Sequence, residues 1–266
     1  MIISVQEQHL SGDTLIEKWA HAQRLGFDAL ELRGAGNGAF AARLPQLQEA
    51  SASGVIMPTE CVEMAHFIGD FDADKRQDAV DQLSQQLRAM SAIGGKIVVS
   101  PASYGMFSDR LPPFVAPRSP AEDRRVLLEG LSSLAAVAEE TGTTLALEPL
   151  NRYENHMVRT LGDAVSLCEE IGSSHLGVCA DTYHMNIEEA DPLRSMLEAA
   201  AWISHVQLSD TNRLEPGAGH LDWGAHLAVL RSIGYRGPLA YESRLSGPAD
   251  QVLPRSVRLV RQLGGA

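Results

Sequence analysis

The chain has 266 residues, of which 44% are hydrophobic and 21% are charged, and its formal net charge is −12. This size and balance are typical of one large α/β domain with a sizeable buried core. Nucleic acid carries dense negative charge, so a chain this acidic argues against a nucleic-acid partner. Cys61, Cys168 and Cys179 share no CxxC spacing, which argues against a disulfide framework or a structural zinc site and favours a reducing cytoplasm.

The N-terminal segment MIISVQEQHL has no basic stretch followed by an apolar one, so we expect no signal peptide. No run approaches 18 apolar residues, so we expect no membrane span. The partner we expect is a small molecule, and the oligomeric state stays open, a homo-oligomer included.

Eight short apolar runs follow one another along the chain and predict strands. They cover residues 2–6, 28–33, 55–61, 96–102, 144–150, 176–182, 204–210 and 238–243. Several begin as continuous apolar runs, as expected of parallel strands that are buried on both faces.

The segments between these runs carry signals for helix ends. Ser119-Pro120-Ala121-Glu122 has the pattern of a capping box with proline at the first helical position. Gly142 follows as a predicted C-cap, and Thr160 and Gly172 bracket another predicted helix. The chain therefore alternates between strands and helices.

Eight strand–helix units in this length average about 33 residues each, the size of a βα unit. An open, doubly wound sheet is the alternative, and it usually has a glycine-rich first βα turn that binds phosphate. Here the first strand leads into EQHLSGD, which has no such fingerprint. We predict an α/β fold with a single (β/α)8 TIM barrel that spans residues 1–266.

Acidic residues stand where several predicted strands end, most clearly Glu148, Asp181 and Glu242. The active site of such a barrel lies at the C-terminal ends of its strands. Carboxylates inside an apolar barrel are costly unless their charge is compensated. Arginine partners are one solution, and the sequence offers Arg33, Arg152, Arg213 and Arg244. A divalent cation with oxygen ligands explains the whole set better.

His184 lies three residues after Asp181, in the loop that follows the strand. A loop histidine of this kind can serve the site, or it can simply accept a hydrogen bond from backbone. The residues alone leave both interpretations open.

Four segments together resemble a known family: ALEPLNRYE (146–154), DTYHMN (181–186), residues 205–213 and YES (241–243). In order and spacing they are similar to the sugar phosphate isomerase/epimerase superfamily, whose xylose isomerase-like barrels include ketose 3-epimerases. The resemblance is specific over residues 143–245 and generic before them.

By position, the resemblance implies that Glu148, Asp181 and Glu242 match three of the four metal ligands of the family. It also implies that Glu148 and Glu242 exchange protons with the substrate. Three further residues match positions that contact or orient the sugar: Glu154, His184 and Arg213.

The fourth ligand position departs from the epimerase pattern. Those epimerases have a histidine there, in a pattern like HxHxGExxR, whereas counting back from Arg213 places Gln207 at the position and His205 two residues earlier. An amide oxygen is a suitable hard ligand for Mg²⁺ or Mn²⁺, and the hydroxypyruvate isomerase-like branch also has glutamine there. The implied cofactor is Mn²⁺ or Mg²⁺, with Co²⁺ or Zn²⁺ as alternatives.

These assignments predict a metal-dependent isomerase or epimerase that moves a proton next to a carbonyl through an enediolate. Carboxylates on opposite faces of the sugar give epimerisation, and one carboxylate working on a single face gives aldose–ketose isomerisation. The substrate is a ketose, an aldose or a small hydroxy-keto acid. A phosphorylated one stays open because of four arginines: Arg110, Arg118, Arg152 and Arg213.

Three other functions fit the same fold. An endonuclease-IV-like zinc nuclease needs more histidines and a basic face, which the net charge of −12 argues against. An inosose-dehydratase-like lyase has similar ligands but eliminates water. A non-catalytic sugar- or metal-binding barrel would be favoured by loss of a proton-transfer carboxylate, but both positions are Glu.

Overall fold

A computed structural model describes residues 1–106 and 115–264. Eight parallel strands pair in chain order, and β8 pairs with β1 to close a barrel. This confirms the predicted TIM barrel and rules out the open sheet. The strands are β1 (Ile2–Gln6), β2 (Ala29–Ala35), β3 (Thr59–Glu63), β4 (Ile97–Pro101), β5 (Thr144–Glu148), β6 (Leu176–Asp181), β7 (Ile203–Leu208) and β8 (Pro238–Tyr241).

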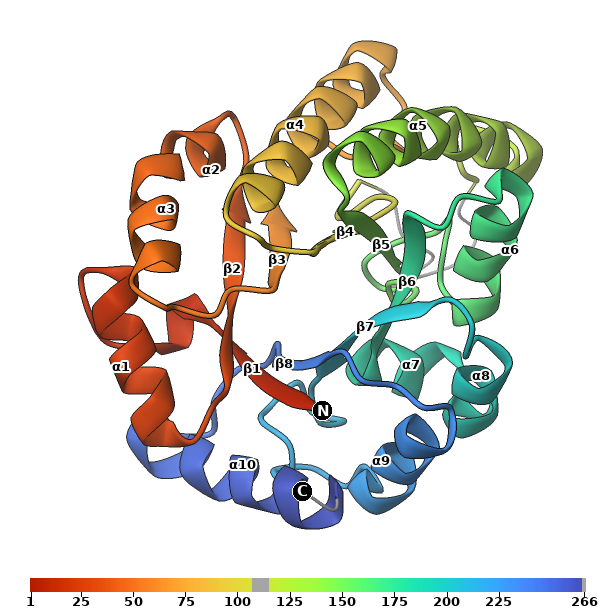
Figure 1. Cartoon of the computed structure of the whole chain (residues 1–266). Coiled ribbons are helices and arrows are strands. Elements are labelled where there is room, and N and C mark those ends of the chain that lie inside the picture. The colour runs from red at the N-terminus through yellow and green to blue at the C-terminus, as the bar shows by residue number, and fades with distance from the viewer. Residues whose placement is uncertain (107–114, 265–266) are drawn as a thin grey trace.

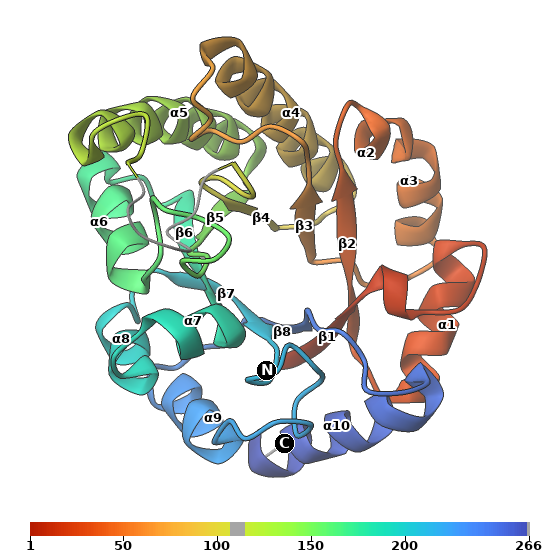
Figure 2. The same ribbon diagram turned by 180° about the vertical axis from the view of Figure 1, so that it is seen from behind.

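Helices surround the strands on all sides, as the views from the two ends of the barrel show (Figures 1 and 2). None of the helices within the described residues is long and apolar enough to cross a membrane. The helices are η1 (Glu7–His9, a 3-10 turn), α1 (Leu15–Leu25), α2 (Ala39–Ala42), α3 (Leu44–Ala52), α4 (Ala73–Ala92), α5 (Pro120–Thr141), α6 (Leu161–Ile171), α7 (Thr182–Glu188), α8 (Pro192–Glu198), α9 (Trp223–Ser232) and α10 (Ala249–Gly264).

The helix ends follow the predicted local chemistry. The Ser119 side chain accepts a hydrogen bond from the backbone of Glu122 at the start of α5, and the reciprocal bond completes the capping box. Thr160 begins α6 in the same way. Gly142 and Gly172 end these helices with φ of 64° and 72°, a left-handed conformation that glycine adopts without a steric penalty.

Beneath the end of β5 the inside of the barrel is apolar. Ile97, Val99, Ala146 and Cys179 form a small buried cluster. Because side chains alternate along a strand, Ala146 and Glu148 share the inner face of β5. The cluster therefore forms an apolar layer beneath the end of β5, and a charge placed above it has little water to stabilise it.

Strand β3 differs from its predicted position. The sequence predicted residues 55–61, but β3 runs from Thr59 to Glu63. Pro58 stands immediately before it and has no N–H to donate to a sheet ladder, which explains the later start. In the observed register Thr59 and Cys61 face the inside of the barrel, and Glu60 faces the helices.

Candidate active site

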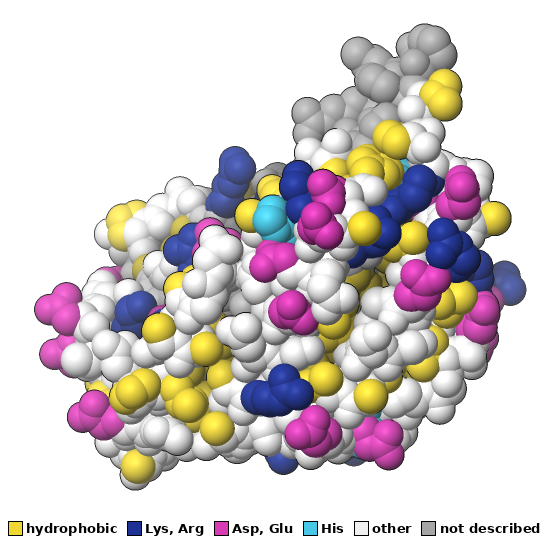
Figure 3. All heavy atoms as spheres, turned by 90° about the horizontal axis from the view of Figure 1, so that it is seen from above, with side chains coloured by type: hydrophobic (Ala, Val, Ile, Leu, Met, Phe, Trp, Pro, Cys, Tyr) yellow, Lys and Arg dark blue, Asp and Glu magenta, His cyan; other side chains and the backbone are white. Residues whose placement is uncertain are grey.

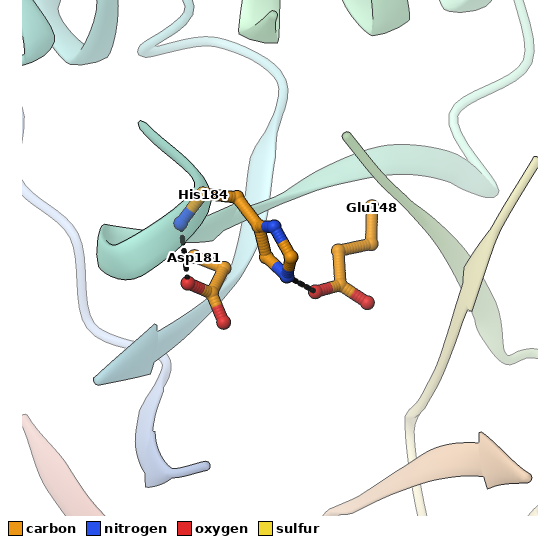
Figure 4. A group of neighbouring side chains, drawn as sticks. All are labelled: Glu148, Asp181 and His184. Atoms are coloured by element: carbon orange, nitrogen blue, oxygen red, sulfur yellow. Dashed lines mark hydrogen bonds and ion pairs between the residues drawn. The ribbon is translucent and has the colours of Figure 1, made fainter. Parts of the chain in front are cut away.

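Three polar side chains meet where β5 and β6 end. Glu148 is the last residue of β5, Asp181 is the last of β6, and His184 lies on α7. Their exposed fractions are 3%, 1% and 1%. One ligand atom from each lies within 4.8 Å of the others. The imidazole of His184 lies beside both carboxylates (Figure 4), with its Nε2 3.7 Å from Glu148 Oε1.

Asp181 is held by the helix that it begins. Its Oδ1 accepts hydrogen bonds from the backbone of Tyr183 at 2.7 Å and of His184 at 3.0 Å. A carboxylate at this position satisfies N–H groups that have no partner within the helix. Its other oxygen, Oδ2, accepts from Arg213 Nη1 at 3.0 Å. The strand end and the first turn of α7 thus fix this carboxylate in one orientation.

The hydrogen bonds of His184 determine its protonation. Its Nδ1 accepts from the backbone N–H of Asn151 at 3.0 Å, and the Asn151 side-chain amide lies 2.8 Å from the same atom. A backbone N–H can only donate, so in the neutral ring Nδ1 is bare and Nε2 carries the proton. Burial lowers the pKa of His184, which favours that neutral ring. His184 therefore offers an N–H donor, a role that suits contact with a substrate oxygen.

Arg213 is the cation that faces these carboxylates. Besides Asp181, its guanidinium contacts Glu242 Oε1 at 3.2 Å, and it lies over the Tyr183 ring at 4.7 Å. Its backbone has φ of 62°, which is uncommon for a residue other than glycine and is found at functional sites. The backbone N–H of Arg244 donates to the carbonyl of Arg213 at 2.7 Å, which fixes this loop conformation.

Negative charge exceeds positive charge in this group. Burial raises the pKa of Glu148 well above its ordinary value, and Glu242 and Asp181 raise it further. Burial also raises the pKa of Glu242, although Arg213 acts in the opposite direction. Burial would raise the pKa of Asp181 too, but Arg213 and His184 hold it below its ordinary value. Three carboxylates thus share one guanidinium.

Within this group of three carboxylates, two oxygens lack a hydrogen-bond partner, although both are buried: Glu148 Oε1 and Glu242 Oε2. Buried polar atoms in proteins nearly always have a partner, so exceptions call for an explanation. A divalent cation bound by carboxylate oxygens would satisfy both atoms and balance the charge. The residues present therefore fit a metal site.

Gln207 lies beside Asp181, because the two residues are paired in register between β7 and β6. Its side chain is fully buried. Its Nε2 donates to Glu31 Oε1 at 3.4 Å, and its Oε1 accepts from the thiol of Cys179 at 3.1 Å. The ionised carboxylate of Glu31 can only accept, which orients the amide with its nitrogen toward Glu31. The amide oxygen, the atom that a metal requires, lies on the side of the Cys179 thiol.

Glu31 is itself satisfied within the barrel. Its carboxylate accepts from Gln6 Nε2 at 3.2 Å and from Thr59 Oγ1 at 3.0 Å, and His205 Nε2 lies 2.7 Å away. Burial would raise the pKa of Glu31, but His205, Thr59 and Gln207 hold it below its ordinary value. The sequence placed His205 two residues before Gln207, but it gave no sign that His205 pairs with Glu31 or that Glu31 contacts Gln207.

A cavity of about 290 Å³ opens above these groups. All three predicted sugar contacts line it together with the two candidate proton-transfer residues: Glu148, Glu154, His184, Arg213 and Glu242. Asn151, which also contacts His184, donates to Glu154 Oε1 at 3.3 Å. The opposite wall includes Phe67 and Tyr104, whose rings meet edge to face at 6.4 Å. Sequence reasoning missed this aromatic wall because no motif marks it.

Of the arginines that kept a phosphorylated substrate open, Arg213 lines the cavity, whereas Arg152 and Arg118 have partners elsewhere. Arg152 pairs with Glu188 at 2.8 Å, and Arg118 pairs with Asp123 at 2.7 Å. Neither lines the cavity, and Arg110 lies outside the described residues. Basic and acidic side chains are interspersed on the face shown in Figure 3, so that face offers no continuous basic surface for nucleic acid.

Comparison with known proteins agrees with this geometry. A family model described as xylose isomerase-like TIM barrel matches residues 19–263. The 3-dehydro-D-guloside 4-epimerase of Escherichia coli (strain K12) is 36% identical over 249 residues, which are 92% of this chain and 93% of that protein. The D-psicose 3-epimerase of Enterocloster bolteae is 39% identical over 120 residues, which are 45% of this chain and 40% of that protein.

Solved structures show the same likeness. A 3-keto-D-glucoside 4-epimerase from E. coli superposes with a TM-score of 0.92 and 34% identity, over 98% of this chain and 99% of that one. A D-psicose 3-epimerase structure obtained in the presence of D-fructose has a TM-score of 0.85 at 21% identity over the full length of both chains, a likeness of fold alone. These relatives are sugar epimerases, as the family resemblance predicted.

Proposed function

The chain belongs to the xylose isomerase-like TIM barrel family, and from this premise we propose that it is a divalent-metal-dependent sugar epimerase in which residues 1–266 act as one barrel domain. One observation carries the proposal. Glu148 and Glu242 line one cavity, and each keeps a buried oxygen that has no hydrogen-bond partner. A cation between them and a sugar in the cavity would use both carboxylates.

Four residues would hold the metal: Glu148, Asp181, Gln207 and Glu242. All four offer oxygen, which favours Mn²⁺ or Mg²⁺, with Co²⁺ or Zn²⁺ as alternatives. When bound, the ion supplies Lewis-acid stabilisation of the charge that develops on the enediolate oxygen. The register between β6 and β7 supports the assignment of Gln207, because it places this residue beside Asp181.

Glu148 and Glu242 would move the protons. They reach the cavity from β5 and from the end of β8, and burial raises the pKa of both. A carboxylate can remove a proton from carbon, and a carboxylic acid can return one. One residue takes the proton from the carbon next to the carbonyl, and the other delivers a proton to the opposite face. The carbon is inverted without net redox change.

His184, Arg213 and Glu154 would bind and orient the sugar. The Nε2–H of His184 and the guanidinium of Arg213 donate toward substrate oxygens, and the Glu154 carboxylate accepts from a hydroxyl. All three line the same cavity as the proton-transfer pair. This arrangement holds the reacting carbon between two carboxylates, as proximity catalysis requires.

A keto-glycoside is the favoured substrate class. The relative that aligns over 92% of this chain is named for a 3-dehydro-guloside, whereas the D-psicose 3-epimerase match spans 45%. A free ketose is the second choice. We also place the enzyme in the cytoplasm, because Cys61, Cys168 and Cys179 are all free thiols, as is usual in a reducing compartment.

The test is exchange of carbon-bound hydrogen with D₂O, followed by NMR. The metal-free protein is reloaded with Mn²⁺ and given methyl 3-dehydro-D-glucoside, D-fructose and D-psicose. We expect deuterium on one carbon next to the carbonyl, and slower exchange by about 10²–10⁴-fold in Glu148→Gln and in Glu242→Gln. Glu198→Gln makes the same change on the exposed side of α8 and serves as the control. Near wild-type exchange in both site variants refutes the proton-transfer roles, and loss of water from the substrate identifies a lyase.

A further inference from the structure

The cleft does not end at Glu242. Next to the first cavity lies a second one of about 290 Å³. The two share a common set of lining residues: Cys61, Val62, Glu63 and Glu242. We call the second cavity the outer lobe, and four residues line it that do not line the first: Gln6, Gln8, Leu32 and Arg33. The cleft is therefore continuous, with Glu242 at the junction.

The reacting sugar belongs in the first cavity. Of the two cavities, only the first is lined by Glu148, His184 and Arg213. A carbon that exchanges protons with both Glu148 and Glu242 must lie there. Ligand pockets begin at about 300 Å³, so this cavity alone suits one sugar ring. A free ketohexose would leave the outer lobe to water.

The lining of the outer lobe suits a neutral group that carries hydroxyls. Gln8 Nε2 donates to Gln6 Oε1 at 2.6 Å, so the two amides hold each other in place. Arg33 forms an ion pair with Glu63 at the rim, where both side chains are about half exposed. Because Glu63 compensates the Arg33 charge, the lobe has no spare cation for a phosphate. Val62, which lines both cavities and is partly exposed, adds an apolar surface. Amides and a neutralised ion pair beside an apolar patch recognise hydroxyl groups on a carbon ring.

We propose that the outer lobe is an aglycone subsite: it binds a neutral, hydroxylated group, such as a second sugar, that is joined through a glycosidic oxygen to the reacting sugar. The proposal rests on the epimerase function proposed above and extends it. All four residues that are particular to the lobe come from β1, β2 and the turn after β1, whereas the proton-transfer residues come from β5 and β8. The residues that would select the substrate and the residues that would move protons thus come from different strands of the barrel.

The test compares two substrates that share the reacting ring: methyl 3-dehydro-D-glucoside, and a 3-dehydro disaccharide in which a second glucose replaces the methyl group. We expect the wild type to have a kcat/KM at least tenfold higher for the disaccharide. Gln8→Trp places a bulky ring in the lobe, and Gln8→Ala removes the amide. We expect Gln8→Trp to lower kcat/KM for the disaccharide at least tenfold more than for the methyl glycoside, and Gln8→Ala to shift the ratio in the same direction.

Gln77→Trp, at an exposed position on α4, is the matched control and should leave the ratio unchanged. Binding of the disaccharide to Glu148→Gln, followed by saturation-transfer NMR, should show contact with the second glucose without any turnover. If the two substrates react equally and Gln8→Trp lowers both alike, the subsite is refuted while the epimerase stands. If neither glycoside nor free ketose exchanges deuterium in the wild type, the proposed function itself fails.

Discussion

The two halves of the barrel treat their buried carboxylates differently. In the half built from β1–β3, Glu7 accepts from both guanidinium nitrogens of Arg43 at 2.7 and 2.9 Å and from Lys18 at 3.1 Å. Glu31 has its own set of donors. In the half built from β5–β8, Glu148 and Glu242 each keep an oxygen without a partner. Glu7 and Glu31 have their partners within the fold, whereas Glu148 and Glu242 each keep an oxygen that a bound group could satisfy.

This contrast separates two uses of a buried acid. A carboxylate with several donors holds structure together, because its desolvation is offset by strong hydrogen bonds. A buried carboxylate without a partner is unfavourable in the free protein and becomes favourable when a ligand arrives. Substitutions in the two halves should therefore affect different properties, and four predictions test that division.

The largest effect is expected at Glu148. Glu148→Gln should slow proton exchange by about 10²–10⁴-fold and yet raise the melting temperature of the metal-free protein, because it removes a buried charge that Glu242 and Asp181 repel. Differential scanning calorimetry in EDTA measures the second effect. A lower melting temperature would mean that Glu148 is satisfied within the fold, and the contrast between the halves would be lost.

The next largest effect is expected at Glu31, which lies in the β1–β3 half but contacts Gln207 in the other half. Glu31→Gln replaces an acceptor-only carboxylate by an amide that can also donate, so the Gln207 amide is no longer held in one orientation. Such supporting contacts typically change metal affinity by about 10–100-fold. Titration of the metal-free protein with Mn²⁺ in competition with a fluorescent chelator measures it. Glu198→Gln should bind Mn²⁺ like the wild type. Unchanged affinity in a folded Glu31→Gln would show that Glu31 does not position Gln207.

Glu7 should show the opposite profile, with a cost in stability and none in metal binding. Glu7→Gln weakens the paired contact with Arg43 and the contact with Lys18, and should cost about 1–3 kcal/mol in urea unfolding at pH 7. Burial would raise the pKa of Glu7, but Arg43, the backbone of Arg33 and Lys18 lower it overall. Its contribution is therefore present above the unfolded pKa and is lost as pH falls through the lowered one. A variant that loses Mn²⁺ affinity instead contradicts the division.

Glu60 is the exception in the β1–β3 half, and its substitution has the smallest expected effect of the four. It lies in the β1–β3 half, yet both of its buried oxygens lack partners. Burial raises its pKa well above the ordinary value, Arg43 opposes that rise, and Glu31 adds to it. The neutral form thus contributes stability that is full below the unfolded pKa and is lost as pH rises through the raised one.

Glu60→Gln, which cannot ionise, should therefore unfold like the wild type at low pH and be more stable by about 1 kcal/mol at pH 9. Thermal unfolding of both proteins across this range measures the difference. A gap that widens toward acid pH would show that the Glu60 carboxylate is stabilised in its charged form.

Local sequence signals predicted most of the fold and those cleft residues that lie in the second half of the chain. The first strand was predicted at its observed bounds, and the caps at Ser119 and Thr160 were confirmed, because these depend on neighbouring residues. Among the predicted strands, β3 differs most from its predicted bounds, and Pro58 explains its later start. The site residues in the second half of the chain followed from their order along the chain. Their roles as ligands, bases and sugar contacts stay predictions.

The rest of the cleft depends on distant contacts. Glu31 and Gln207 are 176 positions apart, and they meet only because the closed barrel brings β2 and β7 together at its centre. Gln8, Phe67 and Tyr104 lie in connections that carry no periodic pattern. The neighbours of a side chain in such a connection are known only once the surrounding strands are placed. The sequence near it therefore could not predict its position in the cleft.

The carboxylate of Asp181 has two separate roles. One of its oxygens starts α7, and the other faces Arg213 at the floor of the cleft. Most substitutions would unravel the first turn of the helix and displace His184 along with the charge. Asparagine can still cap the helix, because it keeps an acceptor of the same length, but it brings no negative charge. Asp181→Asn is therefore the replacement that separates the start of the helix from the charge in the cleft.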